Sequence, residues 1–195
     1  MMQTSLNNVS IRLKSGGHSF STATLGAEVR CAESPVVVSL LTSKTMLVPA
    51  EFFDAKRAED YLAEVGLALS MNECAVYSNA VSGVVAVMAI SEQCYAELQK
   101  AVPAGLCFTS PLLEGEAVEK GSIIHLEDNV LYVRVYNGSM LFAEAIECQS
   151  DADVLYYLAK IDKAYGIYDM YARAKGDVKR LHKLLKPLFK DLVCE

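Results

Sequence analysis

The sequence predicts a mixed α/β fold built from two similar halves, and two observations lead to this prediction. Hydrophobic residues make up 52% of the 195 residues and charged residues only 22%, so the chain has enough apolar surface to bury a sizeable core. The order of the predicted elements, strands followed by alternating helices and strands, begins a second time at Gly121. We therefore expect a first half over residues 1–119 and a second, shorter half over residues 120–195.

The first half begins with a strand over residues 9–14, in which apolar and polar side chains alternate. The Gly16-Gly17 turn leads to a second strand over 19–25. The continuous β-branched run at 35–41 is typical of a central strand, which is buried on both faces. The remaining elements follow from shorter patterns of the same kinds and from Ser91 as a helix cap. They are helices over 50–66 and 92–101 and strands over 74–77, 84–90 and 106–108.

The second half begins with three strands joined by tight turns. Asn137-Gly138 is a strong signal for a two-residue hairpin turn. Ser150 is placed to cap the helix that follows the strands, and Gly166 to end it. The predicted elements are strands over 123–126, 130–136, 140–146 and 167–174, a helix over 151–164, and a last helix after Gly176-Asp177.

Composition excludes several classes of protein. The longest apolar stretch, 83–90, is far shorter than the roughly 18–20 residues that span a bilayer. The first eight residues lack the basic and apolar parts of a signal peptide. The six cysteines are scattered without a CxxC pair, which indicates reduced thiols rather than disulfides or zinc ligands. We therefore expect a cytoplasmic protein with no membrane segment.

The net charge of −6 is unevenly distributed along the chain. Residues 1–165 carry 11 basic and 20 acidic side chains, whereas residues 166–195 carry 7 basic and 4 acidic ones. The acidic body should repel nucleic acid, so only the last helix could attract it. The lysines on one face of that helix are Lys179, Lys183, Lys186 and Lys190.

The order of elements matches the duplicated ribonuclease H-like half of the fold shared by actin, sugar kinases and heat-shock chaperones. Several segments also resemble an uncharacterised bacterial family, a domain of unknown function, whose members have an actin-like ATPase fold. These segments are 9–13, 17–21, 47–53, 153–158 and the strand–helix unit around Gly176-Asp177. The resemblance implies an actin-like ATPase fold with two ribonuclease H-like halves. It implies no activity, because the family has no assigned chemistry.

Active members of the actin-like superfamily hold phosphates between two turns, one from each half. These turns need glycines, which let backbone N–H groups approach the phosphates, and an aspartate that positions Mg²⁺. The corresponding turn of the first half contains Ser15, Gly16 and Gly17 but no aspartate. A plain Gly-Gly hairpin turn explains it better than a phosphate loop does.

The corresponding turn of the second half departs further from the pattern. Glu127, Asp128 and Asn129 include no glycine, and the two carboxylates would repel a polyphosphate. Gly176 stands where the superfamily has a pair of glycines in contact with adenosine, and one of the two is lost. We therefore interpret these turns as remnants of a nucleotide site, and expect no ATP and no other cofactor to bind.

No residues combine into a catalytic site or a metal site in the sequence. The strand over 9–14 lacks the carboxylates that a two-metal nuclease needs. Glu147, Asp151 and Asp153 fit helix capping and the helix dipole better than metal binding. The three histidines lie in a turn, in an apolar strand and on a basic helix, where no nucleophile pairs with them. They are His18, His125 and His182.

Tyrosines are concentrated in the second half and suggest an interface, because tyrosine is enriched at protein–protein contacts. Strand alternation places Tyr132 and Tyr136 on one face of their strand, and Tyr168 belongs to another predicted strand. We therefore predict a protein-binding surface at Tyr132 and Tyr136. It would be exposed unless other elements cover that face of the sheet.

These observations favour a non-catalytic actin-like protein that acts by binding another protein or a second copy of itself. One alternative is a diverged nucleotide-binding ATPase with non-standard phosphate loops. Another is a nucleic-acid accessory protein that uses the basic C-terminal helix. The sequence indicates no particular small-molecule ligand.

Overall fold

The computed structural model describes residues 10–14 and 33–195. The chain divides into two compact units, Met1–Ser110 and Pro111–Glu195. The predicted turn at Ser15, Gly16 and Gly17 and the predicted strand over 19–25 lie outside the described residues.

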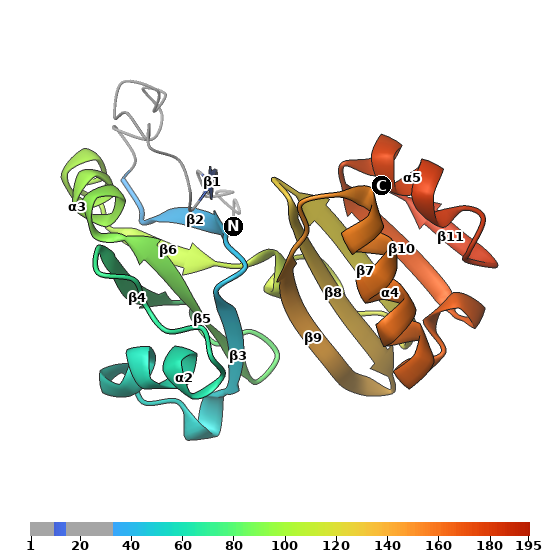
Figure 1. The fold of residues 1–195 in the computed structure, drawn as a ribbon. Coiled ribbons are helices and arrows are strands. Elements are labelled where there is room, and N and C mark those ends of the chain that lie inside the picture. Colours follow the sequence, from blue (N-terminus) through green and yellow to red (C-terminus); the bar gives the residue numbers. More distant parts are fainter. Residues whose placement is uncertain (1–9, 15–32) are drawn as a thin grey trace, which may run out of the picture. The chain divides into compact units, whose positions relative to one another are not determined.

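The first unit contains a parallel sheet of three strands (Figure 1). The strands are β1 (Ser10–Lys14), β2 (Val36–Leu41) and β6 (Leu106–Thr109), in the order β1-β2-β6. Val38 and Leu40 of the central strand have no exposed surface. The central strand predicted from the continuous apolar run is confirmed, because a strand covered on both faces needs no polar alternation.

A second, antiparallel sheet lies in the same unit. It consists of β3 (Thr45–Pro49), β5 (Val84–Ser91) and β4 (Glu73–Tyr77), in the order β3-β5-β4. Helix α2 (Ala58–Glu64) packs Leu62 against Val48 and Val87 of this sheet. The strands predicted over 74–77 and 84–90 are thereby confirmed.

The helix predicted over 50–66 begins later than expected. Two 3₁₀ turns, η2 (Ala50–Phe52) and η3 (Ala55–Arg57), precede α2. Phe53 and Asp54 between them have extended backbones, and the Asp54 side chain accepts a hydrogen bond from the Lys56 N–H. Phe53 therefore ends the first turn and Asp54 caps the second, because the Asp54 carboxylate competes with helical hydrogen bonding.

Helix α3 (Glu92–Ala101) begins where the sequence predicts it. The Ser91 hydroxyl accepts a hydrogen bond of 3.2 Å from the Cys94 N–H and caps the helix. The chain then turns at Gly105 into β6, the strand predicted at 106–108.

The second unit is built on one mixed sheet of five strands. The order is β11-β10-β7-β8-β9, in which β7, β8 and β9 form an antiparallel meander and β10 and β11 run parallel to β7. Its elements are η4 (Pro111–Leu113), β7 (Lys120–Glu127), β8 (Val130–Asn137), β9 (Ser139–Glu147), α4 (Asp151–Tyr165), η5 (Ile167–Asp169), β10 (Tyr171–Gly176), α5 (Val178–Leu185) and β11 (Asp191–Cys194).

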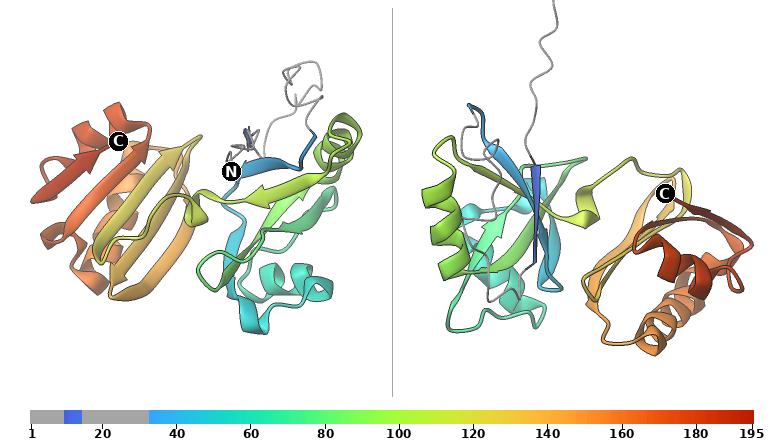
Figure 2. Two further views of the ribbon diagram at one scale, coloured as in Figure 1. Left: turned by 180° about the vertical axis from the view of Figure 1, so that it is seen from behind. Right: turned by 90° about the horizontal axis from the view of Figure 1, so that it is seen from above.

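Helices α4 and α5 cover one face of this sheet (Figures 1 and 2). Leu158 of α4 and Leu181 of α5 join Ile124, Leu131 and Val133 of the central strands in one core. The segment after η4 crosses the opposite face of the sheet on its way to β7, as the view from behind shows (Figure 2). The central strands β7 and β8 are buried on both faces, whereas the edge strands β9 and β11 keep exposed residues.

Two predictions for the end of the chain need correction. The strand predicted over 167–174 begins only at Tyr171, and Tyr168 lies in η5 instead. Gly166 is left-handed there, and the Asp162 carboxylate accepts a hydrogen bond from the Tyr168 N–H at 2.8 Å, which holds the turn. Strand β11, which pairs with β10, was not predicted, because its four residues are too short to show a pattern.

None of the helices in the described part of the chain is both long enough and apolar enough to cross a membrane.

Candidate functional site

The second unit brings together two of the three predicted nucleotide contacts. The Glu127–Asn129 turn follows β7, and Gly176 ends β10, which is paired with β7. Gly176 lies opposite Leu126, whose carbonyl oxygen accepts a hydrogen bond of 2.7 Å from the Asp177 N–H. The third contact, at Ser15, Gly16 and Gly17, is outside the described residues.

The turn at Asp128 and Asn129 is a closed hairpin turn. Both residues have positive φ angles, 51° and 62°, and Glu127 pairs directly with Val130 across the hairpin. Two consecutive left-handed residues form the tight turn that suits the twist of a hairpin. The Asn129 carbonyl oxygen also accepts a hydrogen bond of 2.7 Å from the Cys148 N–H. The turn therefore provides carboxylates and a fixed hairpin connection, without a glycine loop for phosphates.

Gly176 has a structural reason to be glycine. Its φ angle is 81°, and a Cβ atom there would lie 2.2 Å from the Leu126 carbonyl oxygen and 2.8 Å from the His125 ring. Only glycine fits such an approach between two backbones. Asp177 next to it caps α5, since its carboxylate accepts a hydrogen bond of 3.2 Å from the Arg180 N–H.

His125 is a buried, paired side chain. It is 5% exposed, its Nε2 lies 2.9 Å from Glu127 Oε2, and its ring meets the Tyr132 ring edge-on at 5.8 Å. In the apolar strand where the sequence placed it, His125 is therefore a packed core residue with a polar partner.

The acidic residues around α4 take part in capping and in an ion pair. Ser150 and Asp153 form a reciprocal capping box at the start of the helix. Asp151 binds Arg180 of α5, with 2.6 Å between Oδ1 and Nε. Over residues 10–14 and 33–195, no three His, Cys, Asp or Glu side chains are grouped as a metal site would require.

Tyr132 and Tyr136 are not exposed, so the predicted apolar patch does not form. Their exposed fractions are 1% and 7%, and Arg134 between them is 5% exposed. The Arg134 side chain donates a hydrogen bond of 2.5 Å to the carbonyl oxygen of Glu114, in the segment that crosses this face of the sheet. Burial lowers the pKa of the Arg134 guanidinium, while Tyr136 and Glu114 partly offset the effect. Both rings therefore belong to the buried interior, beside an arginine that is held by this segment.

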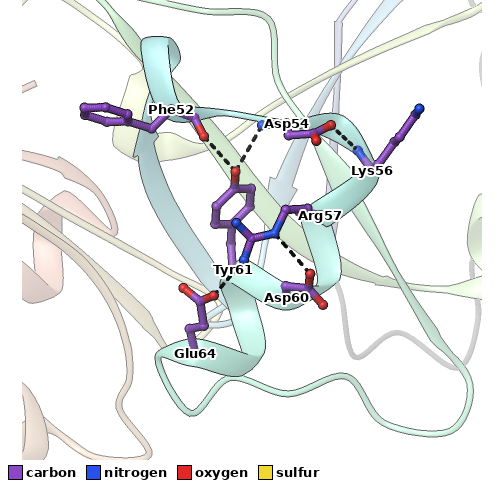
Figure 3. A network of polar contacts seen from close by, with 7 residues as sticks. All are labelled: Phe52, Asp54, Lys56, Arg57, Asp60, Tyr61 and Glu64. Atoms are coloured by element: carbon purple, nitrogen blue, oxygen red, sulfur yellow. Dashed lines mark hydrogen bonds and ion pairs between the residues drawn. The ribbon is translucent and has the colours of Figure 1, made fainter.

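An exposed aromatic surface occurs instead in the first unit, and the sequence analysis missed it. Phe52, in η2, is 69% exposed. Its backbone is fixed by Tyr61 of α2, whose hydroxyl donates a hydrogen bond of 2.7 Å to the Phe52 carbonyl oxygen and accepts one of 3.0 Å from the Asp54 N–H (Figure 3). The Phe52 ring points away from this network. The backbone around Phe52 is thus fixed by hydrogen bonds while its apolar ring is exposed to solvent.

Other aromatic side chains extend from this point toward β4. The Phe53 ring lies 6.0 Å from the Tyr61 ring and 5.1 Å from the Tyr77 ring. Tyr77, the last residue of β4, is 45% exposed. We call Phe52, Phe53 and Tyr77 the aromatic surface; the Tyr61 ring lies buried beneath it, at 7% exposure. A Phe-Phe pair ahead of a helix is equally compatible with core packing, so the sequence carried no signal for it.

Arg57 lies over the Tyr61 ring, next to the aromatic surface. Its guanidinium carbon is 5.4 Å from the ring centroid, and its nitrogens lie 3.3 Å from Asp60 and 3.0 Å from Glu64 (Figure 3). The hydrogen bond with Asp60 and the charge of Glu64 raise the pKa of Arg57. The apolar rings therefore have a charged rim at α2.

A cleft of about 510 Å³ lies between β4, α3 and β6. Its volume is within the range of roughly 300–1,000 Å³ that is usual for ligand pockets. The Tyr95 and Phe108 rings in its wall are 6.0 Å apart. The twelve residues around it are uncharged: Ala75, Val76, Tyr77, Asn79, Tyr95, Gln99, Val102, Pro103, Gly105, Leu106, Cys107 and Phe108. Tyr77 belongs both to this cleft and to the aromatic surface.

Comparison with solved structures identifies the fold. A protein from Bacteroides thetaiotaomicron, described as having an actin-like ATPase fold and unknown function, matches 83% of this chain and 68% of its own with a TM-score of 0.66 and 19% identity. A second match is the cytoplasmic domain of EpsL, an inner-membrane component of the type II secretion system of Vibrio cholerae. It covers 95% of this chain and 84% of its own length, with a TM-score of 0.44 and 16% identity. No protein-family model and no curated protein matches the sequence. The chain has an actin-like ATPase fold, and at these identities the likeness extends to the fold alone.

Proposed function

We propose that this chain is a non-catalytic actin-like protein that acts by binding another protein. One observation carries the proposal that the protein is non-catalytic: in the second unit, the residues at the expected nucleotide contacts are needed for the turn and for strand packing. Asp128 and Asn129 close a hairpin, and Gly176 is needed for the approach of β10 to Leu126. A nucleotide would find no glycine loop at the hairpin and would face two carboxylates.

We further propose that the two units are diverged ribonuclease H-like halves. The strand order of the second unit supports this, because a three-strand meander followed by two parallel strands on the β7 side is the arrangement expected of such a half. The first unit has the corresponding parallel strands in β1, β2 and β6. The boundary proposed from the sequence, at residues 119–120, lies at the start of β7, nine residues after the division of the two compact units at Ser110–Pro111.

A melting experiment with nucleotide tests the non-catalytic part. A ligand at 100 times its dissociation constant stabilises a protein by about 2.7 kcal/mol, which is a shift of several degrees for a domain of this size. We expect no shift with Mg-ATP relative to Mg²⁺ alone. An upward shift that requires ATP would contradict the proposal and favour a diverged ATPase with non-standard phosphate loops.

The aromatic surface supports the second part, binding to a protein. Aromatic side chains contribute most to binding when they are buried in a complex, and a side chain held in place before binding loses less conformational entropy. The Phe52 ring is available for such burial because it is exposed, and the Tyr61 hydroxyl already fixes the Phe52 backbone. An isolated exposed Phe would be unremarkable, but this one is followed in the chain by Phe53, whose ring meets that of the exposed Tyr77.

Site-specific photo-crosslinking tests the binding surface. A photoreactive phenylalanine at position 52 should yield a discrete crosslinked species in the source cells. The same group at Tyr156, which is 55% exposed on α4 of the other unit, is the control and should yield none. A crosslinked species with twice the mass of the chain would mean self-association. Equal yields at both positions, or no species at position 52, would contradict the surface.

A further inference from the structure

One edge of β4 faces the cleft with its main-chain groups. The Ser78 N–H donates to the Ala86 carbonyl oxygen and the Glu92 N–H to the Asn72 carbonyl oxygen, both at 2.9 Å. The main-chain groups of the even-numbered residues from 72 to 78 therefore bond to β5 and its flanking residues, because an antiparallel strand alternates its hydrogen bonds between its two sides. The N–H and C=O groups of Ala75 and the N–H of Tyr77 point to the other side, which is the side of the cleft, whereas the Tyr77 C=O is used in the parallel bridge to Phe108.

Strand β6 forms the opposite edge of the cleft. It pairs with β2 on one side, and its other side meets the β4 end only at a single parallel bridge between Ser78 and Phe108. From that bridge the two strands diverge without further pairing among the described residues. The space between them is the cleft, so strand edges form two of its walls.

The remaining walls favour an uncharged occupant. Tyr95 and Phe108 provide aromatic faces, and Asn79 and Gln99 provide amides that can both donate and accept hydrogen bonds. A charged group that enters such a space loses hydration without gaining an opposite charge. An open strand edge is recognised by another extended main chain, and the side-chain pockets beside it then select the sequence.

We propose that the cleft binds an extended, uncharged peptide segment of a partner protein, which pairs with the open edge of β4. This inference rests on the proposed protein-binding function and names the chemistry of the partner. The segment supplies main-chain groups to Ala75 and Tyr77 and places apolar side chains against Tyr95 and Phe108. Tyr77 connects the bound segment with the aromatic surface, so a larger partner can contact Phe52 at the same time.

Selection from a library of random peptides, with the full chain as target, tests the proposal. The enriched peptides should be uncharged at their centre and rich in β-branched and aromatic residues. In NMR titrations with a synthetic enriched peptide, the amide signals of Ala75, Tyr77 and Cys107 should shift. A Lys or Glu at the centre of the peptide should weaken binding at least tenfold. Enriched peptides with charged centres, an unenriched library, or shifts confined to other residues would overturn the proposal.

Matched variants separate the cleft from the rest of the surface. Gln99 is exposed on α3, so the Gln99→Glu variant should fold. Its affinity for the selected peptide should fall about tenfold, because the bound segment covers the new charge. Gln93→Glu adds the same charge to the same helix outside the cleft and should leave binding unchanged. Ala75→Pro removes the N–H donor on the cleft side, at an edge position where proline is tolerated, and should abolish binding.

The outcomes also distinguish this inference from the proposed function. Equal peptide affinity of Gln99→Glu and wild type would overturn the cleft proposal. If crosslinking at position 52 persisted in that case, protein binding through the aromatic surface would still stand. Loss of crosslinking at position 52 with an intact peptide site would contradict the aromatic surface instead.

Discussion

The Tyr61 hydroxyl and the Phe52 carbonyl oxygen are joined by a hydrogen bond of 2.7 Å, and this bond links a helix to an exposed aromatic loop. In Tyr61→Phe the bond and its partner from the Asp54 N–H are lost, while the ring remains packed against Phe53. We expect a loss of about 1 kcal/mol in the free energy of unfolding and greater mobility of the Phe52 amide in NMR relaxation. Tyr156→Phe, at an exposed position, is the control and should change neither. Unchanged Phe52 mobility would show that the loop is held by other contacts.

Gly176→Ala should destabilise the protein severely. The new Cβ atom would meet the Leu126 carbonyl oxygen at 2.2 Å, and the backbone would keep a φ angle of 81°. Strain and overpacking together should cost roughly 3 kcal/mol. Gly138→Ala is a matched control, since its φ angle is 76° but nothing lies within 4 Å of the added atom. It should cost about 1 kcal/mol. Urea denaturation of both variants measures the difference, and similar losses would mean that packing against Leu126 is unimportant.

Local signals in the sequence predicted most of the fold correctly. The Ser150–Asp153 capping box acts within a few residues, so the sequence alone could place it. The hairpin predicted at Asn137-Gly138 forms, but Gly138 alone lies between the paired residues Asn137 and Ser139, so the connection is not the two-residue turn that was predicted. Strand β11 could not be predicted, because four residues become a strand only through pairing with β10. The helix predicted over 50–66 begins only at Ala58, because the Asp54 side chain caps the separate turn η3 before it.

The candidate sites were harder to predict because exposure depends on distant parts of the chain. Tyr132 alternates with Val133 as a half-exposed strand would, yet the segment after η4 covers its face of the sheet. Phe52 resembles a core residue in sequence, yet the Tyr61 hydroxyl holds its loop so that the ring stays in solvent. In both cases a contact between separate elements decides the outcome, and hydrophobic periodicity does not record such contacts.

Glu73→Gln should lower stability near neutral pH but not at low pH. Burial raises the pKa of Glu73, but hydrogen bonds from Lys44 Nζ, at 2.5 Å, and from the Ser70 N–H lower it more, so that it falls below its ordinary value of 4.5. The stabilisation is therefore present above pH 4.5 and is lost as the pH falls through the folded-state pKa. We expect a difference of about 1 kcal/mol from wild type at pH 7, which disappears on acidification.

A pH series of urea denaturation curves measures this effect. Asp60→Asn is the control, because its pair with Arg57 is more than half exposed and should contribute little at any pH. A difference between Glu73→Gln and wild type that stayed constant down to pH 3 would mean that the charge of Glu73 is not the cause.

The basic C-terminal helix should not bind nucleic acid. Two cations of this region are already paired: Arg180, on α5, with Asp151, and Lys190, beyond the end of α5, with Asp169, each at 2.6 Å. The chain as a whole carries a net charge of −6 and repels phosphates. We expect no change in the fluorescence anisotropy of a labelled single-stranded RNA at physiological salt. Binding that weakens steeply with added salt, and that is lost in Lys179→Glu, Lys183→Glu, would instead support the nucleic-acid accessory role, because those lysines lie on α5 itself.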